Sequence, residues 1–264
     1  MEEIFSVSRG EAPLLISVPH LGSIIPGRLQ SDYTDIALTV ADTDWHLDRL
    51  YNFASELGAT VLQAQVSRYV IDLNRPPSDE SLYPGQTTTG LFPQQTFRGE
   101  PIYREGRVLD AAEKARRLND YWHPYHNAIE HELGRLRDQH GNVLLWEAHS
   151  IASVLPRLFD GKLPDLNFGT QDGRTANEAV LRAATDVAGE SSYTWIANGR
   201  FKGGYITRRF GAPQNGIHAL QLEMCQSIYM NESHPFNYEP RRASVLQPTL
   251  RAMVGAALSA VSQL

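Results

Sequence analysis

Two histidines directly follow apolar runs of the kind that form buried strands. His20 comes after LLISVP, and His149 comes after VLLWEA. In an open α/β sheet, ligands bind at the carboxyl ends of the strands, so two neighbouring strands would place both imidazoles in one crevice. Two histidines, one carboxylate and an open position for water form a common catalytic zinc site. The pair therefore predicts a metal site, and the alternative is two unrelated histidines that bond to the backbone.

The carboxylate that would complete this site is expected in the stretch VADTDWHLDRL. Asp44 stands where the N-cap residue of the expected helix would stand, and an N-cap carboxylate binds backbone N–H groups without any metal. Asp42 lies outside that helix, where structure gives less reason for a carboxylate. Asp48 is expected to be solvated or salt-bridged. We therefore prefer Asp42 as the third ligand and keep Asp44 as the alternative.

A substrate carboxylate has a candidate binding pair at the end of another apolar run, SRYVIDLNRPP. The guanidinium of Arg75 can bind a carboxylate through two hydrogen bonds, and the neighbouring Asn74 can add a third. The two prolines that follow restrict the backbone beyond the pair. The alternative is a surface ion pair between Arg75 and Asp72 or Asp79. Arg68 is a similar candidate with less support from its position.

A second substrate carboxylate could be bound by the basic segment NGRFKGGYITRRFGAP. This segment lacks both G-x-G-x-x-G and the Walker lysine motif, so it does not predict a nucleotide site. It does offer Arg200, Lys202 and Arg209 to an anionic ligand. We keep all three as candidate substrate-binding residues.

Glu223 lies late in the apolar run HALQLEMCQ. Burying a carboxylate costs free energy unless it has a partner or a chemical task. Beside a metal-bound water, Glu223 would act as general base and would then pass the proton to the departing amine. The alternative is a charge at the exposed end of a strand.

Composition narrows the class of protein. The chain has 264 residues, 42% of them hydrophobic and 20% charged, which is typical of a globular protein. Its net charge of -6 argues against nucleic acid as a partner. The chain starts without a signal-peptide pattern, has no apolar run near the roughly 20 residues that cross a bilayer, and has one cysteine, Cys225. We expect a cytoplasmic protein with no membrane contact, while the sequence leaves the oligomeric state open.

Apolar runs alternate with helical patterns, which predicts an α/β fold. We expect strands at residues 13–19, 60–64, 69–73, 143–148, 193–197 and 217–223. We expect helices at 44–58, at about 107–140 with a kink at Pro124, and in TANEAVLRAATDVAG and the C-terminal segment. Residues 76–106, rich in Pro, Gly and Thr, are expected to form a long active-site loop within one domain of residues 1–264.

Taken together, the motifs resemble the N-formylglutamate deformylase family, also called the N-formylglutamate amidohydrolases. The resemblance covers residues 12–240 and rests on SVPHLG, DTDWH, SRYVIDLNRPP, SLYPG, YWHPYH, EAHSIAS, PRLFDGKLPDLNFGT, NGRFKGGYITR and LQLEM. It implies hydrolysis of N-formyl-L-glutamate to L-glutamate and formate, the last step of a histidine degradation pathway. It also implies kinship with zinc carboxypeptidases and hence a three-layer α/β/α fold with a mixed central sheet.

The resemblance also implies roles for particular residues. Relatives among the zinc carboxypeptidases bind zinc through His-x-x-Glu and a later His, bind the substrate carboxylate with an Asn-Arg pair and use a late Glu as base. These roles fall on residues already chosen, namely His20, His149, Asn74, Arg75 and Glu223. Position 23 is Ser, so the Glu of His-x-x-Glu is missing and the third ligand must come from elsewhere.

Three alternatives remain at this point. The chain could be a metal-dependent deacylase of another N-acyl amino acid, a carboxypeptidase-like enzyme, or a protein that binds an acidic amino acid without reaction. The metal could be zinc, iron, cobalt or manganese, because histidine and carboxylate ligands suit all four.

Overall fold

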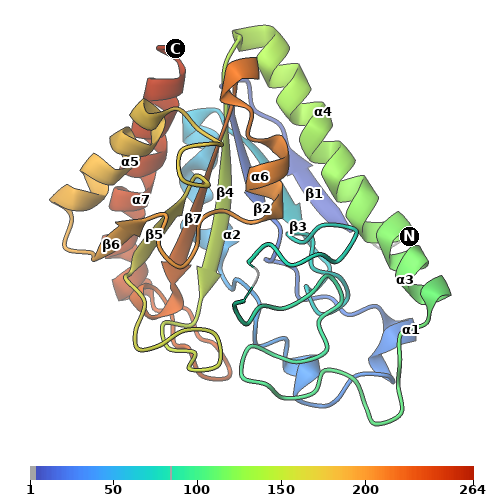
Figure 1. Ribbon diagram of the computed structural model, residues 1–264. Coiled ribbons are helices and arrows are strands. Elements are labelled where there is room, and N and C mark those ends of the chain that lie inside the picture. Colours follow the sequence, from blue (N-terminus) through green and yellow to red (C-terminus); the bar gives the residue numbers. More distant parts are fainter. Residues whose placement is uncertain (1–3, 84) are drawn as a thin grey trace.

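The computed structural model describes residues 4–83 and 85–264, and its centre is a seven-stranded mixed sheet with the order β1-β3-β2-β4-β7-β5-β6 (Figure 1). The strands β2, β3, β4 and β7 run parallel to one another, whereas β1 is antiparallel to β3 and β5 is antiparallel to β7. The strand bounds are Phe5–Ser8 (β1), Leu14–Val18 (β2), Thr60–Ala64 (β3), Val143–Ile151 (β4), Leu166–Gly169 (β5), Trp195–Ala197 (β6) and Ile217–Cys225 (β7).

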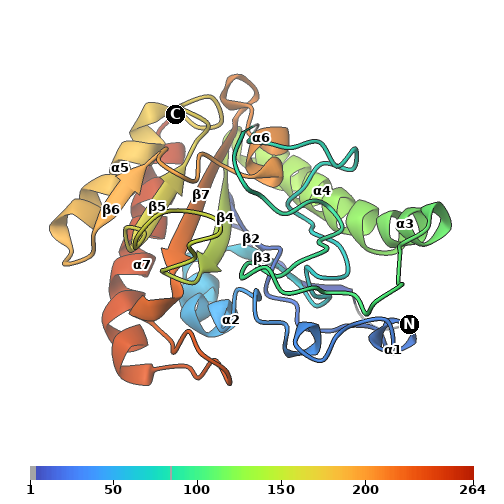
Figure 2. The same cartoon turned by 60° about the horizontal axis from the view of Figure 1, so that its bottom comes forward.

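Helices cover both faces of this sheet, which gives three layers (Figures 1 and 2). On one face, α5 (Glu178–Glu190) and α7 (Pro240–Val261) pack on the even-numbered residues of β2 and β4. On the other face, α4 (His123–His140) and the short α6 (Tyr205–Phe210) pack on residues such as Leu15 and Leu145. The apolar runs of β2 and β4 follow from this cover, because a strand buried on both faces needs no polar alternation.

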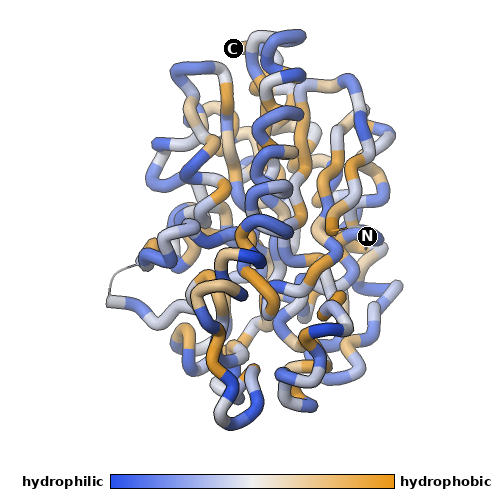
Figure 3. The backbone as a smooth tube through the Cα atoms, turned by 90° about the vertical axis from the view of Figure 1, so that its right-hand side faces the viewer, coloured by the Kyte–Doolittle hydropathy of each residue, from blue (hydrophilic) through white to orange (hydrophobic). Residues whose placement is uncertain are grey.

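Several polar residues of the central strands lie on the face of the sheet that α4 covers. Side chains alternate between the two faces of a strand, so Ser17, Glu147 and His149 lie on the α4 face with Leu15 and Leu145. Figure 3 views the molecule from this side and shows mainly hydrophilic residues along α4, with hydrophobic stretches in the strands around it. The buried polar residues of the sheet therefore lie beneath α4, α6 and the loops next to them.

The remaining elements are short. They are α1 (Gly27–Gln30), α2 (Leu47–Leu50), α3 (Ala111–Arg117), a π-helical turn (Leu118–Trp122) and the 3-10 helices Ala37–Thr39, Asn52–Leu57, Pro213–Asn215 and Gln226–Ile228. The helix expected at 107–140 thus contains a π-helical turn just before Pro124, where a kink was expected. No helix among residues 4–83 and 85–264 has the length and apolar character needed to cross a membrane.

Most expected strands are confirmed, and the exceptions have physical reasons. Residues 69–73 form a buried turn segment instead of a strand, because Val70 bonds to Ser67 and Asp72 bonds to Leu91 across loops. The expected helix at 44–58 is divided into α2 and a 3-10 helix. The strands β1 and β5 were not expected, since each has only four residues. The described residues of 76–106 form an irregular loop beside the carboxyl ends of the central strands (Figure 2).

Gly22 allows the chain to leave β2 in close contact with a neighbouring segment. A Cβ atom at this position would lie 2.2 Å from the carbonyl oxygen of Val66 and 2.5 Å from the carbonyl carbon of Gln65. Ile24, two residues further on, donates its N–H to Gln65 O, so this backbone has little freedom to move away. Gly22 therefore fixes the path of the chain directly after His20.

We expect Gly22→Ala to lower the free energy of unfolding by about 1–3 kcal/mol, because the added methyl group overlaps backbone atoms that cannot yield. Gly27→Ala is the matched control, since a Cβ there meets nothing within 4 Å. It should change stability by no more than about 0.5 kcal/mol. Urea denaturation of both variants measures the difference, and equal stability of the two would show that this close contact is not restrictive.

Candidate active site

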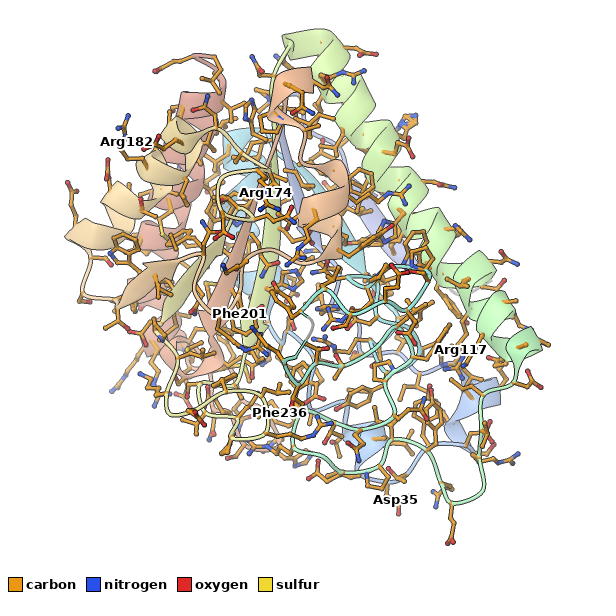
Figure 4. The ribbon with its side chains drawn as sticks, viewed as in Figure 1. Asp35, Arg117, Arg174, Arg182, Phe201 and Phe236 are labelled. Atoms are coloured by element: carbon orange, nitrogen blue, oxygen red, sulfur yellow. The ribbon has the colours of Figure 1, made fainter. Side chains whose placement is uncertain are left out.

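A cavity opens at the carboxyl edge of the sheet, where β2, β4 and β7 end. It is lined by strand residues, by the segment that contains residues 68–97 and by the loop around residues 200–204. Figure 4 shows Phe201, one of the lining residues, in front of the lower ends of the central strands, which are their carboxyl ends in this view. The lining comprises His20, Arg68, Asn74, Arg75, Tyr83, Thr87, Thr88, Thr89, Phe97, His149, Ser150, Ile151, Leu158, Arg200, Phe201, Gly204, Gln221 and Glu223.

His20, Asp44 and His149 form a buried group that could hold a metal ion. Asp44 Oδ2 lies 3.1 Å from His149 Nδ1 and 3.8 Å from His20 Nδ1. His20 Nδ1 and Asp44 Oδ1 have no hydrogen-bond partner within the described part of the chain. Because buried polar atoms without partners are costly, a cation between these atoms would satisfy both. Two imidazole nitrogens and a carboxylate are ligands that suit zinc and related divalent metals.

A second carboxylate orients His20. The Nε2 atom of His20 donates to Asp72 Oδ1 at 2.7 Å, which leaves Nδ1 on the side of Asp44. Asp72 also accepts from Arg68 at 2.7 Å and from the Asn74 N–H at 2.9 Å. Burial opposes ionisation of Asp72, but His20 and Arg68 hold the pKa of its carboxyl well below the usual range. Metal-binding histidines commonly have such a partner, which fixes the tautomer.

His149 lies in a more acidic environment than His20. Its Nε2 atom lies 3.5 Å from Glu147 Oε1 and 3.0 Å from Asn74 Nδ2. Burial disfavours the imidazolium, but the hydrogen bonds to Asp44 and Glu147 raise the pKa of His149 to about 10. Burial and the Arg68 charge lower the pKa of His20 to about 4. The site therefore attracts one positive charge next to Asp44, which a proton or a metal cation can supply.

Glu223 stands beside His149 on the neighbouring strand. The two residues are register partners in the parallel β4–β7 pair, and both line the cavity. Burial raises the pKa of the Glu223 carboxyl to about 8. Such a carboxyl exchanges protons near neutral pH, as a general base or acid must.

Asn74 and Arg75 both line the cavity, and the surrounding protein fixes them there. Asn74 Oδ1 accepts from the Ile206 N–H at 2.8 Å. Arg75 Nε donates to Thr89 O at 2.7 Å, and one of its terminal nitrogens donates to Thr89 Oγ1 at 3.2 Å. Arg75 therefore presents a positive charge from a fixed position in the cavity wall. A terminal nitrogen of Arg75 lies 4.0 Å from Asp72 Oδ2, so the ion-pair partner of Arg75 is buried inside the site and not on the surface.

The structure places one of the three basic candidates in the cavity wall and the other two outside it. Arg200 lines the cavity and donates to Thr87 O at 3.2 Å. Lys202 does not line it, because its ammonium pairs with Asp172 at 3.1 Å on the exposed side of the loop. Arg209 does not line it either, because α6 directs its guanidinium over the Trp122 ring at 5.5 Å. The expectation that all three face one ligand is thus not met by Lys202 and Arg209.

Asp42, the preferred third ligand, lies outside the metal group. Its Oδ2 atom accepts the Phe97 N–H at 2.7 Å, and burial raises the pKa of its carboxyl to about 6. The preference failed because α2 begins later than expected, with His46 as its N-cap residue. Asp44 is therefore not the cap of that helix, and its carboxylate faces the two histidines instead.

Sequence reasoning gave no role to several polar residues of this site. Glu147 and Gln221 each lie two residues before a chosen residue on the same strand, so the alternation of side chains places them on the same face. Asp72 lies two residues before Asn74, but in a turn where no such rule holds. Arg68 was a weak candidate, and the structure places it in the cavity wall.

Comparisons with known proteins identify the family of this chain. The profile of a family described as N-formylglutamate amidohydrolase matches residues 12–230. N-formylglutamate deformylases from Pseudomonas putida and Pseudomonas aeruginosa are each 46% identical over 260 residues, which is 98% of this chain and 97% of theirs. The crystal structure of N-formylglutamate amidohydrolase from Ralstonia eutropha JMP134 superposes with a TM-score of 0.82 and 25% identity, over 98% of both chains. An Agrobacterium tumefaciens gene product, 19% identical, shares the fold with a TM-score of 0.75 over 98% of this chain and 94% of its own. The chain therefore belongs to the N-formylglutamate amidohydrolase family.

Proposed function

We propose that this protein hydrolyses N-formyl-L-glutamate to L-glutamate and formate. We further propose that the reaction needs a divalent metal ion, with zinc as the preferred metal. One observation carries the proposal: His20 and His149 line one cavity with the buried Glu223, and both histidines belong to a metal-capable group with Asp44. Family membership and the names of the 46% identical relatives support the choice of substrate. The same site supports the kinship with zinc carboxypeptidases that the sequence motifs imply.

His20, Asp44 and His149 would hold the metal. The bound ion would polarise the formyl carbonyl and make a water molecule easier to deprotonate. Iron, cobalt or manganese would fit the same ligands. Asp72 and Glu147 keep the two imidazoles in place, because each carboxylate lies beside the Nε2 atom of one histidine.

Glu223 would move the proton. Its carboxylate takes a proton from water as the water oxygen attacks the formyl carbon, and it delivers that proton to the glutamate nitrogen as the C–N bond breaks. Burial favours this exchange, because it raises the pKa of Glu223. Arg68, at 3.9 Å from Asp44 Oδ1, keeps a positive charge at the metal group while negative charge develops on the substrate.

The amino-acid half of the substrate would lie against the arginines. Arg75 and Arg200 both line the cavity and can each face one carboxylate of glutamate. Arg200 is the one residue of the basic segment that we retain for this role from the three expected. The residues 76–106 would then act as the active-site loop, because Tyr83, Thr89 and Phe97 close the cavity on that side.

Purified protein supplied with zinc should release formate from N-formyl-L-glutamate. We expect kcat/KM to be at least about tenfold lower for N-acetyl- and N-succinyl-glutamate, because the cavity must exclude larger acyl groups. A chelator should remove the activity, and added zinc should restore it. Equal turnover of the three substrates would point to a general deacylase, and binding without turnover would point to a binding protein.

Asp44→Ala should lose bound metal, whereas Asp42→Ala should keep it. Asp44 contributes a ligand, so its removal should weaken zinc binding by more than about 100-fold, beyond the usual effect of losing an outer partner. Asp42 binds the Phe97 N–H instead. Metal content and zinc titration of the two folded variants measure the difference, and the reverse pattern would restore Asp42 as the ligand.

Glu223→Gln should reduce kcat by about 10²–10⁴ while zinc content stays stoichiometric, because the amide keeps the shape of the side chain and cannot accept the proton. KM should change little, since the arginines and not Glu223 bind the carboxylates. Steady-state kinetics with metal analysis on the same sample test this. Intact turnover in the variant would remove Glu223 from the mechanism.

A further inference from the structure

A second cavity lies next to the metal group. Three residues, Phe97, Ser150 and Ile151, line both this cavity and the catalytic one. The catalytic cavity has a volume of about 70 Å³, whereas the second has about 450 Å³. The other residues that line the second cavity include Asp42, Glu100 and Phe236. The smaller catalytic cavity and the larger second cavity thus share part of their lining, and we call the three shared residues, Phe97, Ser150 and Ile151, the wall.

The side chain of Phe97 is the bulkiest part of this wall. The Arg68 guanidinium carbon lies 4.6 Å from the centre of its ring, and Phe97 is 7% exposed. Its backbone N–H donates to the buried Asp42 carboxylate at 2.7 Å. The turn that carries it is closed by the Gln95–Pro101 bridge and by the Thr96 N–H donating to Glu100 O at 2.9 Å. The ring is therefore held in place from several sides.

The wall adjoins the end of the cavity where the acyl group would lie. Ser150 donates its N–H to Asp44 Oδ2 at 3.1 Å, and the Arg68 guanidinium, which lies over the Phe97 ring, is 3.9 Å from Asp44 Oδ1. Arg75 and Arg200 line the catalytic cavity but not the second one. A substrate with its carboxylates on these arginines and its carbonyl at the metal group would have its acyl substituent on the side of the wall, where Phe97 is the bulkiest side chain.

We propose that Phe97 limits the acyl group of the substrate to formyl, by filling the space that a larger acyl substituent would need. The inference rests on the proposed function and adds a residue that sets acyl selectivity. The formyl group carries only hydrogen on its carbonyl carbon, whereas acetyl adds a methyl group that would meet the ring. Exclusion of one methyl or methylene group by an apolar wall is worth about 10- to 200-fold in kcat/KM.

Phe97→Ala should join the two cavities and admit larger acyl groups. We expect the ratio of kcat/KM for N-acetyl-L-glutamate to that for N-formyl-L-glutamate to rise at least about tenfold, and the ratio for N-propionyl-L-glutamate to rise as well. The ratio is the readout because a general loss of activity affects both substrates alike. Phe97→Leu, a milder change, should give a rise between those of the wild type and Phe97→Ala.

Phe236→Ala is the matched control. Phe236 lines the second cavity but not the catalytic one, so its truncation enlarges that space and leaves the wall in place. In Phe236→Ala, the ratio of kcat/KM for N-acetyl-L-glutamate to that for N-formyl-L-glutamate should equal the wild-type ratio. Zinc content and the circular dichroism spectrum of each variant establish that folded, metal-loaded protein is compared.

An unchanged ratio in folded Phe97→Leu and Phe97→Ala would overturn the inference, as would an equal rise in Phe236→Ala. If Phe97→Ala does not fold, the ratio in Phe97→Leu decides alone. Failure of the wild type to hydrolyse N-formyl-L-glutamate would instead overturn the proposed function, together with the inference that depends on it. The two failures are therefore distinct.

Discussion

The excess of buried negative charge at the carboxyl edge of the sheet is the constraint on which the rest of the site depends. Asp44, Asp72, Glu147 and Glu223 are all buried there, while Arg68 is the arginine buried among them. Uncompensated buried charges are strongly destabilising, so these carboxylates require protons or cations. The structure meets this need unequally: Asp72 has Arg68 and His20, whereas Asp44 keeps one oxygen without a partner. A divalent cation at Asp44 would supply the missing charge.

Strand register places part of this charge, namely Glu147 and Glu223, whereas Asp44 and Asp72 lie outside the strands. In the parallel β2–β4 pair Ser17 is the partner of Glu147, and in the β4–β7 pair His149 is the partner of Glu223. Paired residues of parallel strands point to the same face, so His149, a candidate metal ligand, and Glu223, a candidate base, become neighbours through strand register. The opposite face of the same strands is apolar and packs on α5 and α7. The rigidity of that packing is what holds the polar face in place.

How far the sequence predicts the site depends on the kind of backbone that carries each residue. His149 and Glu223 lie on strands, where apolar runs and the strand-end rule locate side chains well. Asp44 lies in a segment of short helical turns, where the choice against it depended on its being the N-cap residue of a helix whose N-cap, His46, lies two residues later in the structure. Lys202 lies in a loop, where no periodicity gives the side-chain direction. Residues 69–73 are buried and, apart from Asp72, apolar or aromatic, although they form no strand.

The two carboxylates of the stretch DTD, residues 42–44, have different structural roles. Asp44 faces the histidines, and Asp42, two residues earlier, holds the Phe97 N–H of a loop that is distant in sequence. The backbone between them is short, and Thr43 O accepts from Gln226 at 3.0 Å, so the same fixed segment carries both carboxylates. Any shift of the metal group would therefore move the support of Phe97. The position of the wall is thus tied to the position of the reacting atoms, which is what a selective wall around a small substrate group requires.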